Sequence, residues 1–154
     1  MTTPLQPYRQ NPLLRFSYSL IAPLYDLIIE APMRAARKRS LAALPATAGR
    51  EILVSGAGTG LDLPHLPGMH RYTALDFNPD MLARARPRGT HLDVTFVLGD
   101  SMALPFDDAR FDTVVLHLIV AVVPEPQRAL SEAARVLKPG GKILLFDKFL
   151  KPGQ

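Results

Sequence analysis

Cysteine is absent from the 154-residue sequence, which excludes disulfide bonds, a thiolate nucleophile and any metal site built on thiolates. Long hydrophobic runs are missing as well. The longest apolar stretch, residues 113–123, is interrupted by His117 and falls short of the ~20 residues that a membrane-spanning helix needs. The N-terminal tail has no cationic region that leads into an apolar one, as a secretory signal would. We therefore expect a cytoplasmic protein that forms one domain.

Acidic residues are scarce in the first third of the chain. Residues 1–50 hold seven Lys/Arg and two acids, a net charge of +5, whereas residues 51–154 hold eleven basic and twelve acidic residues, a net charge of −1. A localised excess of cations indicates an anionic partner, such as a membrane surface or a nucleic acid, although a solvated helix face has the same composition. The densest run of cations consists of Arg34, Arg37, Lys38 and Arg39.

After Pro45, short apolar runs alternate with helical stretches, which is typical of βαβ units around a parallel sheet. We expect an α/β fold, a Rossmann-like doubly wound parallel sheet of about five strands preceded by helices. Residues 1–48 are expected to form a tail and a helical lid, and residues 49–154 the core of the same domain.

The boundaries of these elements follow from apolar periodicity and from capping residues. The expected strands cover residues 51–55, 71–75, 93–98, 113–118 and 141–147. The expected helices lie near residues 13–21, 23–30, 32–44, 60–66, 79–86 and 125–137. Asn78 is the expected N-cap of the helix at 79–86, and the Pro139-Gly140-Gly141 run is expected to close the last helix.

Three glycines at alternate positions, Gly56, Gly58 and Gly60, follow the first expected strand. Glycine permits a tight turn, and its missing side chain lets a ligand approach the backbone. The loop lies at the carboxyl end of a strand, where doubly wound sheets bind nucleotides. By itself such a loop does not separate a nucleotide site from a plain structural turn.

Two aspartates at the ends of the next two strands extend this signal to an adenosine site. Asp76, sixteen residues beyond Gly60, can accept hydrogen bonds from both ribose hydroxyls, or it can cap the following helix. Asp100 can accept a hydrogen bond from the exocyclic amine of adenine. Met102 and Met81 can pack against the faces of the ring, although either methionine can also be a core residue.

The motifs in this order resemble the class I S-adenosylmethionine-dependent methyltransferases over roughly residues 50–148. The matching elements are the glycine loop, Asp76, Asp100, the strand at 111–115 and the run at 134–142. A narrower resemblance, to bacterial phosphatidylethanolamine N-methyltransferases and the related ubiquinone/menaquinone methylases, is carried by residues 118–124, residues 146–149 and the Tyr25-Asp26 pair.

The resemblance implies S-adenosyl-L-methionine as the cofactor and a small-molecule or lipid acceptor, with a phospholipid amine as the narrower expectation. Neither a metal nor a nucleic acid is expected. The implied cofactor contacts are Ser55, Gly56, Ala57, Gly58, Asp76, Phe77, Met81, Asp100, Ser101, Met102 and His117.

Methyl transfer from a sulfonium to a good nucleophile depends on alignment more than on acids and bases. The catalytic candidates are therefore acceptor-side residues: Tyr25, in the segment that by resemblance covers the cofactor, and His117, at the end of the fourth strand. Both have a structural alternative, as a packed aromatic and a satisfied buried histidine. His65, His70 and His91 lack metal-ligand spacing and are expected at the surface.

Two departures from the family pattern bear on function. Val54 stands where the family usually has an acidic residue that helps to hold the methionine end of the cofactor. The family sheet also continues beyond the fifth strand, whereas this sequence ends at Gln154. Either the sequence is a fragment of a longer protein, or the fifth strand is an edge that invites pairing with a second copy, to give a homodimer or a swapped assembly.

Three other functions are compatible with parts of the sequence. A nicotinamide-dependent oxidoreductase would use the glycine loop, but the loop lacks the G-x-G-x-x-G spacing. A nucleic-acid methyltransferase would use the cationic run, but no Asn/Asp-Pro-Pro-aromatic motif follows the fourth strand. A non-catalytic or truncated methyltransferase-like module that acts in assembly would account for Val54 and for the missing strands.

Overall fold

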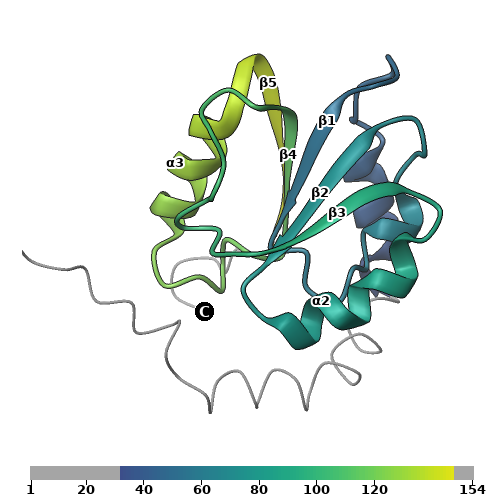
Figure 1. Ribbon diagram of the computed structural model, residues 1–154, viewed down its shortest axis with the longest axis horizontal. Helices are drawn as coiled ribbons and strands as arrows, with labels where there is room; N and C mark the ends of the chain where they lie inside the picture. The colour runs from purple at the N-terminus through teal and green to yellow at the C-terminus, as the bar shows by residue number, and fades with distance from the viewer. Residues whose placement is uncertain (1–31, 148–154) are drawn as a thin grey trace, which may run out of the picture.

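A five-stranded parallel sheet organises the part of the chain that the computed structural model describes, residues 32–147 (Figure 1). The strand order is β3-β2-β1-β4-β5, and every neighbouring pair is parallel. The strands are β1 (Glu51–Ser55), β2 (Arg71–Asp76), β3 (Asp93–Leu98), β4 (Phe111–His117) and β5 (Leu137–Phe146). The expected Rossmann-like α/β sheet is confirmed.

Helices cover both faces of the sheet (Figure 1). One face carries a helix over residues 32–41 together with α2 (Pro79–Ala85) and the 3-10 turns η1 (Leu63–His65) and η2 (Arg86–Gly89). The opposite face carries α3 (Pro126–Val136). No helix in the described part of the chain is both long and apolar enough to cross a membrane.

The central strand β1 is buried on both sides, which explains its unbroken apolar sequence. Successive side chains of a strand point to opposite faces. Ile52 and Val54 accordingly pack in a cluster with Leu41, whereas Leu53 packs in the other cluster with Phe111. The carboxyl end of β1 therefore lies in the middle of the sheet, between the ends of β2 and β4.

The expected start of α2 is confirmed in detail. Asn78 is its N-cap, and the side-chain oxygen accepts a hydrogen bond from the backbone N–H of Asp80 at 2.9 Å. Pro79 occupies the first turn, where the missing N–H has no intrahelical partner to lose. This cap fixes the direction of the chain immediately after Asp76 at the end of β2.

The expected helix at 60–66 is wrong, and so is the expected role of the Pro139-Gly140-Gly141 run in closing the helix at 125–137, whose own extent is confirmed. The stretch at 60–66 contains only the 3-10 turn η1, because Pro64 and Pro67 cannot donate the backbone hydrogen bonds of a longer helix. At the other end of the core, α3 stops at Val136 and the chain enters β5 at once, so the Pro139-Gly140-Gly141 run lies inside a strand. The pairing of β4 with β5 shifts register across this run, and Gly140 adopts a φ of +80° that suits the irregularity.

His70 is a further correction, since it is buried and not at the surface. Its Nε2 donates to the carbonyl oxygen of Pro45 at 2.9 Å, and its Nδ1 accepts from the backbone N–H of Arg50 at 3.3 Å. The histidine thus fastens the loop before β1 to the start of β2. Its role is structural, at the amino-terminal ends of β1 and β2, and the glycine loop lies at the opposite ends of the strands.

Within residues 32–147, β5 pairs only with β4 and forms one edge of the sheet. Leu145 on this strand is 43% exposed. The expectation of an edge strand is confirmed for the described residues, and pairing with a second copy stays a prediction.

Candidate functional site

The glycine loop turns sharply at the carboxyl end of β1. Gly56, Gly58 and Gly60 have φ values of +73°, +57° and +80°, which side chains other than glycine rarely adopt. A Cβ on Gly56 would lie 2.5 Å from Cγ1 of Ile119, so this glycine is required by close packing. Among residues 32–147, nothing lies within 4 Å of a Cβ added to Gly58. The backbone of Gly58 therefore faces open space, as an approaching ligand requires.

Asp76 lies beside this open face and is joined to it directly. Its Oδ2 accepts a hydrogen bond from the backbone N–H of Gly58 at 2.8 Å, and its Oδ1 accepts one from Asn78 at 3.0 Å. Burial raises the pKa of the Asp76 carboxyl above its ordinary range, although hydrogen bonds from the N–H groups of Asn78, Gly58 and Phe77 oppose the rise. Each oxygen has lone pairs left for further donors, such as the hydroxyls of a ribose.

Asp100 begins the loop after β3 and is held close to Asp76. The Oδ1 atom of Asp100 accepts from the backbone N–H of Met102 at 2.8 Å. Ser55 at the end of β1 donates to Ser101 at 2.7 Å, and this buried contact ties the loop to the glycine turn. The predicted cofactor residues that follow β1, β2 and β3 therefore meet at the carboxyl ends of these parallel strands. Among the flanking apolar candidates, Met102 is buried and Phe77 and Met81 are half-buried.

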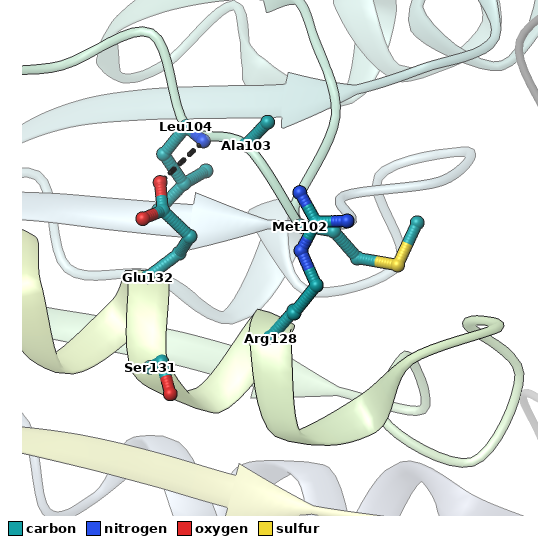
Figure 2. A pocket seen from close by; sticks show the side chains of 6 residues that line it. All are labelled: Met102, Ala103, Leu104, Arg128, Ser131 and Glu132. Carbon is teal, nitrogen blue, oxygen red and sulfur yellow. Dashed lines mark hydrogen bonds between the residues drawn. The ribbon is translucent and has the colours of Figure 1, made fainter. Parts of the chain in front are cut away.

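The loop that carries Asp100 is anchored to α3 (Figure 2). Glu132 on α3 accepts a hydrogen bond from the backbone N–H of Leu104 at 2.8 Å. Arg135, one turn further along, donates to the carbonyl oxygens of Leu104 and Phe106 at 3.0 and 2.8 Å. A cavity of about 310 Å³ beside the loop is lined by Met102, Ala103, Leu104, Arg128, Ser131 and Glu132. These contacts fix the position of the loop relative to α3.

His117 ends β4 and belongs to a buried polar cluster that the sequence did not reveal. Its Nδ1 contacts Oδ1 of Asp62 at 2.7 Å, and its Nε2 contacts Oγ of Ser40 at 2.8 Å. Arg37 donates to the same Oδ1 of Asp62. Burial alone would raise the pKa of Asp62, but the hydrogen bond from His117 and the charge of Arg37 outweigh it, so the pKa is lowered.

The buried cluster includes one of the cations that were expected on the surface. Arg37 is wrong as a member of the cationic surface, because it is 4% exposed and paired with Asp62. The signal that could have revealed it is helical spacing, since Arg37 lies four residues before the buried Leu41 and thus on the buried stripe of the helix.

The other catalytic candidate, Tyr25, lies outside the described residues. Within residues 32–147, no group of three metal-binding side chains is arranged around a common point.

Known proteins share this arrangement. The family model described as "Methyltransferase domain" matches residues 53–145, which is more than half of the chain. The chain belongs to the class I S-adenosylmethionine-dependent methyltransferases. S-adenosylmethionine is the cofactor of this family, and the open face of Gly58 and the two strand-end aspartates suit it.

Two curated relatives show how far the similarity extends. A phosphatidylethanolamine N-methyltransferase of Cereibacter sphaeroides is 38% identical over 132 residues, which cover 83% of this chain and 64% of the relative. A demethylmenaquinone methyltransferase of Renibacterium salmoninarum is 36% identical over 132 residues, covering 82% and 55%. This chain thus spans about two thirds or less of the length of these two relatives.

Solved structures agree with the fold. A Haloferax volcanii methyltransferase chain, from a complex with the Trm112 methyltransferase activator, superposes with a TM-score of 0.71 at 31% identity, covering 82% of this chain and 57% of that one. DhpI, solved as a complex with SAH (S-adenosylhomocysteine), superposes with a TM-score of 0.68 at 30% identity, covering 84% and 64%.

The open face of Gly58 predicts that alanine at this position blocks the cofactor and leaves the fold intact. Gly58→Ala should weaken S-adenosylhomocysteine binding by about tenfold or more, because the new methyl group projects into the ligand space. Gly49→Ala is a matched control, because Gly49 lies outside the glycine loop, has a φ of +80° and has no atom of the described residues within 4 Å of an added Cβ. Both variants should lose a similar ~1–2 kcal/mol of unfolding free energy. Equal calorimetric affinities in the two variants would contradict the assignment.

The position of Asp76 predicts a cofactor affinity that depends on pH. Asp76→Asn should weaken S-adenosylhomocysteine binding about 10- to 100-fold at neutral pH, because hydrogen bonds to a charged acceptor are worth ~1.5–3 kcal/mol. As the pH is lowered, Asp76 takes up a proton and loses its charge. Because its pKa is raised, the native affinity should begin to fall before the pH reaches the ordinary aspartate pKa of about 4. The pH dependence should vanish in the asparagine variant. Calorimetric titrations across this range measure both effects, and a pH-dependent asparagine variant would point to another group.

Proposed function

We propose that this chain transfers the methyl group of S-adenosylmethionine to the amine of a phospholipid, with phosphatidylethanolamine as the first acceptor to test. The observation that supports methyl transfer most directly is the meeting of Gly58, Asp76 and Asp100 at one edge of the sheet. The similarity to the phosphatidylethanolamine N-methyltransferase of Cereibacter sphaeroides supports a lipid amine as the acceptor.

The cofactor site in this proposal uses the residues around the glycine turn. Asp76 would accept hydrogen bonds from the ribose hydroxyls, and Asp100 would accept one from the adenine amine. Apolar contacts to the ring would come from Phe77, Met81 and Met102. The remaining contacts would come from the loop residues Ser55, Gly56, Ala57, Gly58 and Ser101. When bound, S-adenosylmethionine supplies an electrophilic methyl group, and the protein supplies alignment.

The chemistry of the acceptor side favours nitrogen over carbon. An amine is a nucleophile once it has lost a proton, whereas methylation of a quinone ring carbon also requires removal of a proton from that carbon. His117 at this edge of the sheet already uses both ring nitrogens, on Asp62 and Ser40. A quinone ring is the second candidate acceptor, because the demethylmenaquinone methyltransferase of Renibacterium salmoninarum is 36% identical to this chain.

The helix over residues 32–41 supports contact with an anionic membrane. Arg34, Lys38 and Arg39 are exposed on it, and Arg34 and Lys38 lie one turn apart on the same face. A cationic side chain near an anionic bilayer contributes about 1 kcal/mol to binding. Peripheral binding through these three cations would bring the domain to its lipid acceptor. The outer edge of β5 is the proposed surface for a homodimer.

The proposed acceptor predicts labelled methyl transfer into phosphatidylethanolamine vesicles. Mass spectrometry should detect the monomethylated lipid, and the rate should rise when an anionic phospholipid replaces part of a neutral one. Lys38→Gln/Arg39→Gln should remove most of this rise, because the variant loses two of the three exposed cations. Product on demethylmenaquinone and none on phosphatidylethanolamine would replace the lipid amine by the quinone. Transfer to neither, with S-adenosylhomocysteine still bound, would favour a non-catalytic module.

A further inference from the structure

The cluster of Arg37, Ser40, Asp62 and His117 joins three separate segments of the chain. Arg37 and Ser40 lie on the helix over residues 32–41, Asp62 lies two residues past Gly60, and His117 ends β4. The side chains of Arg37, Asp62 and His117 are 5%, 6% and 1% exposed. Charged groups are seldom buried this deeply, so the cluster requires an explanation.

Stability alone does not account for the cluster. Removing two charges from water costs more than their attraction returns unless the geometry is excellent, and apolar replacements of buried ion pairs are often as stable or more stable. Here the geometry leaves a donor unused, because the buried Nε of Arg37 has no hydrogen-bond partner among residues 32–147. A buried ion pair does, however, specify one arrangement of the segments that it joins.

The hydrogen bonds of the cluster occupy both ring nitrogens of His117. The Asp62 carboxylate can only accept, so Nδ1 of His117 donates to it. Nε2 of the ring lies 2.8 Å from the Ser40 hydroxyl, which can either donate or accept a hydrogen bond. His117 thus has no ring nitrogen left for an acceptor molecule. Its ring also packs edge-on against Phe146 at the end of β5, with centroids 5.6 Å apart.

The location of Asp62 links this cluster to the cofactor loop. The backbone N–H of Gly60 donates to Ala57 at 3.0 Å and that of Leu63 donates to Gly60 at 3.1 Å, so the chain from the glycine turn to Asp62 is a continuous series of tight turns. A displacement of Asp62 would therefore be felt at the glycine turn on one side and at His117 on the other.

We propose that Asp62 is a positioning residue, which clamps the helix over residues 32–41 and the carboxyl end of β4 into one fixed wall beside the cofactor loop. His117 acts through this clamp and not as a base. The consequence for catalysis is that the wall sets the alignment of the acceptor with the methyl group, and this consequence rests on the proposed function. A misplacement of about 1 Å at such a site costs about 100-fold in rate.

The test compares the native chain with two variants. Asp62→Asn keeps an acceptor for Nδ1 of His117 but loses the charge that holds Arg37. Arg37→Met/Asp62→Asn removes both charges, so no orphaned cation remains if the single variant fails to fold. Glu125→Gln is the control, because it breaks an ion pair with Arg128 whose side chains are about half exposed. Each protein is measured by amide hydrogen exchange, by S-adenosylhomocysteine calorimetry and by methyl transfer to phosphatidylethanolamine vesicles.

The clamp predicts faster exchange over residues 32–41 in both variants but not in the control. It predicts a kcat lower by about 10- to 100-fold, with the S-adenosylhomocysteine Kd changed less than about threefold. Native exchange rates in the variants would overturn the clamp. Faster exchange with an unchanged kcat, or a Kd that weakens as much as kcat falls, would reduce it to ordinary structural support. If the native chain turns over no acceptor, the proposed function fails, and the exchange rates alone decide the clamp.

Discussion

One hydrogen bond, from the backbone N–H of Gly58 to Oδ2 of Asp76 at 2.8 Å, joins the turn after β1 to the end of β2. It exists because β1 and β2 are parallel neighbours, which brings their carboxyl ends to the same edge of the sheet. Gly58 has a φ of +57° in this turn, and no other described residue lies within 4 Å of the position where its Cβ would be. The same carboxylate, buried and with a raised pKa, is thereby held facing the ligand space.

The sheet and the cofactor edge could be predicted because their signals are local. The boundaries of β1 and β3 follow from short apolar runs, and the cap at Asn78 follows from the Asn-Pro-Asp sequence. The Pro139-Gly140-Gly141 run was predicted to end a helix, since proline and glycine usually do so. It lies instead in β5, because pairing with β4 across a register shift prevails over the local preference.

The parts that could not be predicted depend on contacts between distant residues. Arg37 and Arg39 are neighbours in one cationic run, yet one is buried against Asp62 and the other is exposed. Only the packing of the helix on the sheet separates them. His117 was correctly placed at the end of β4, but its partners Asp62 and Ser40 are 55 and 77 residues away in the sequence. No spacing rule connects such residues.

The most direct test of the account is a crystal structure of the chain with S-adenosylhomocysteine. The account predicts both ribose hydroxyls within hydrogen-bond distance of the Asp76 carboxylate, the adenine amine at Asp100, and the open side of Gly58 covered by the ligand. A nucleoside bound elsewhere, or Asp76 still bonded only to Gly58 and Asn78 in the complex, would contradict the assignment of the site.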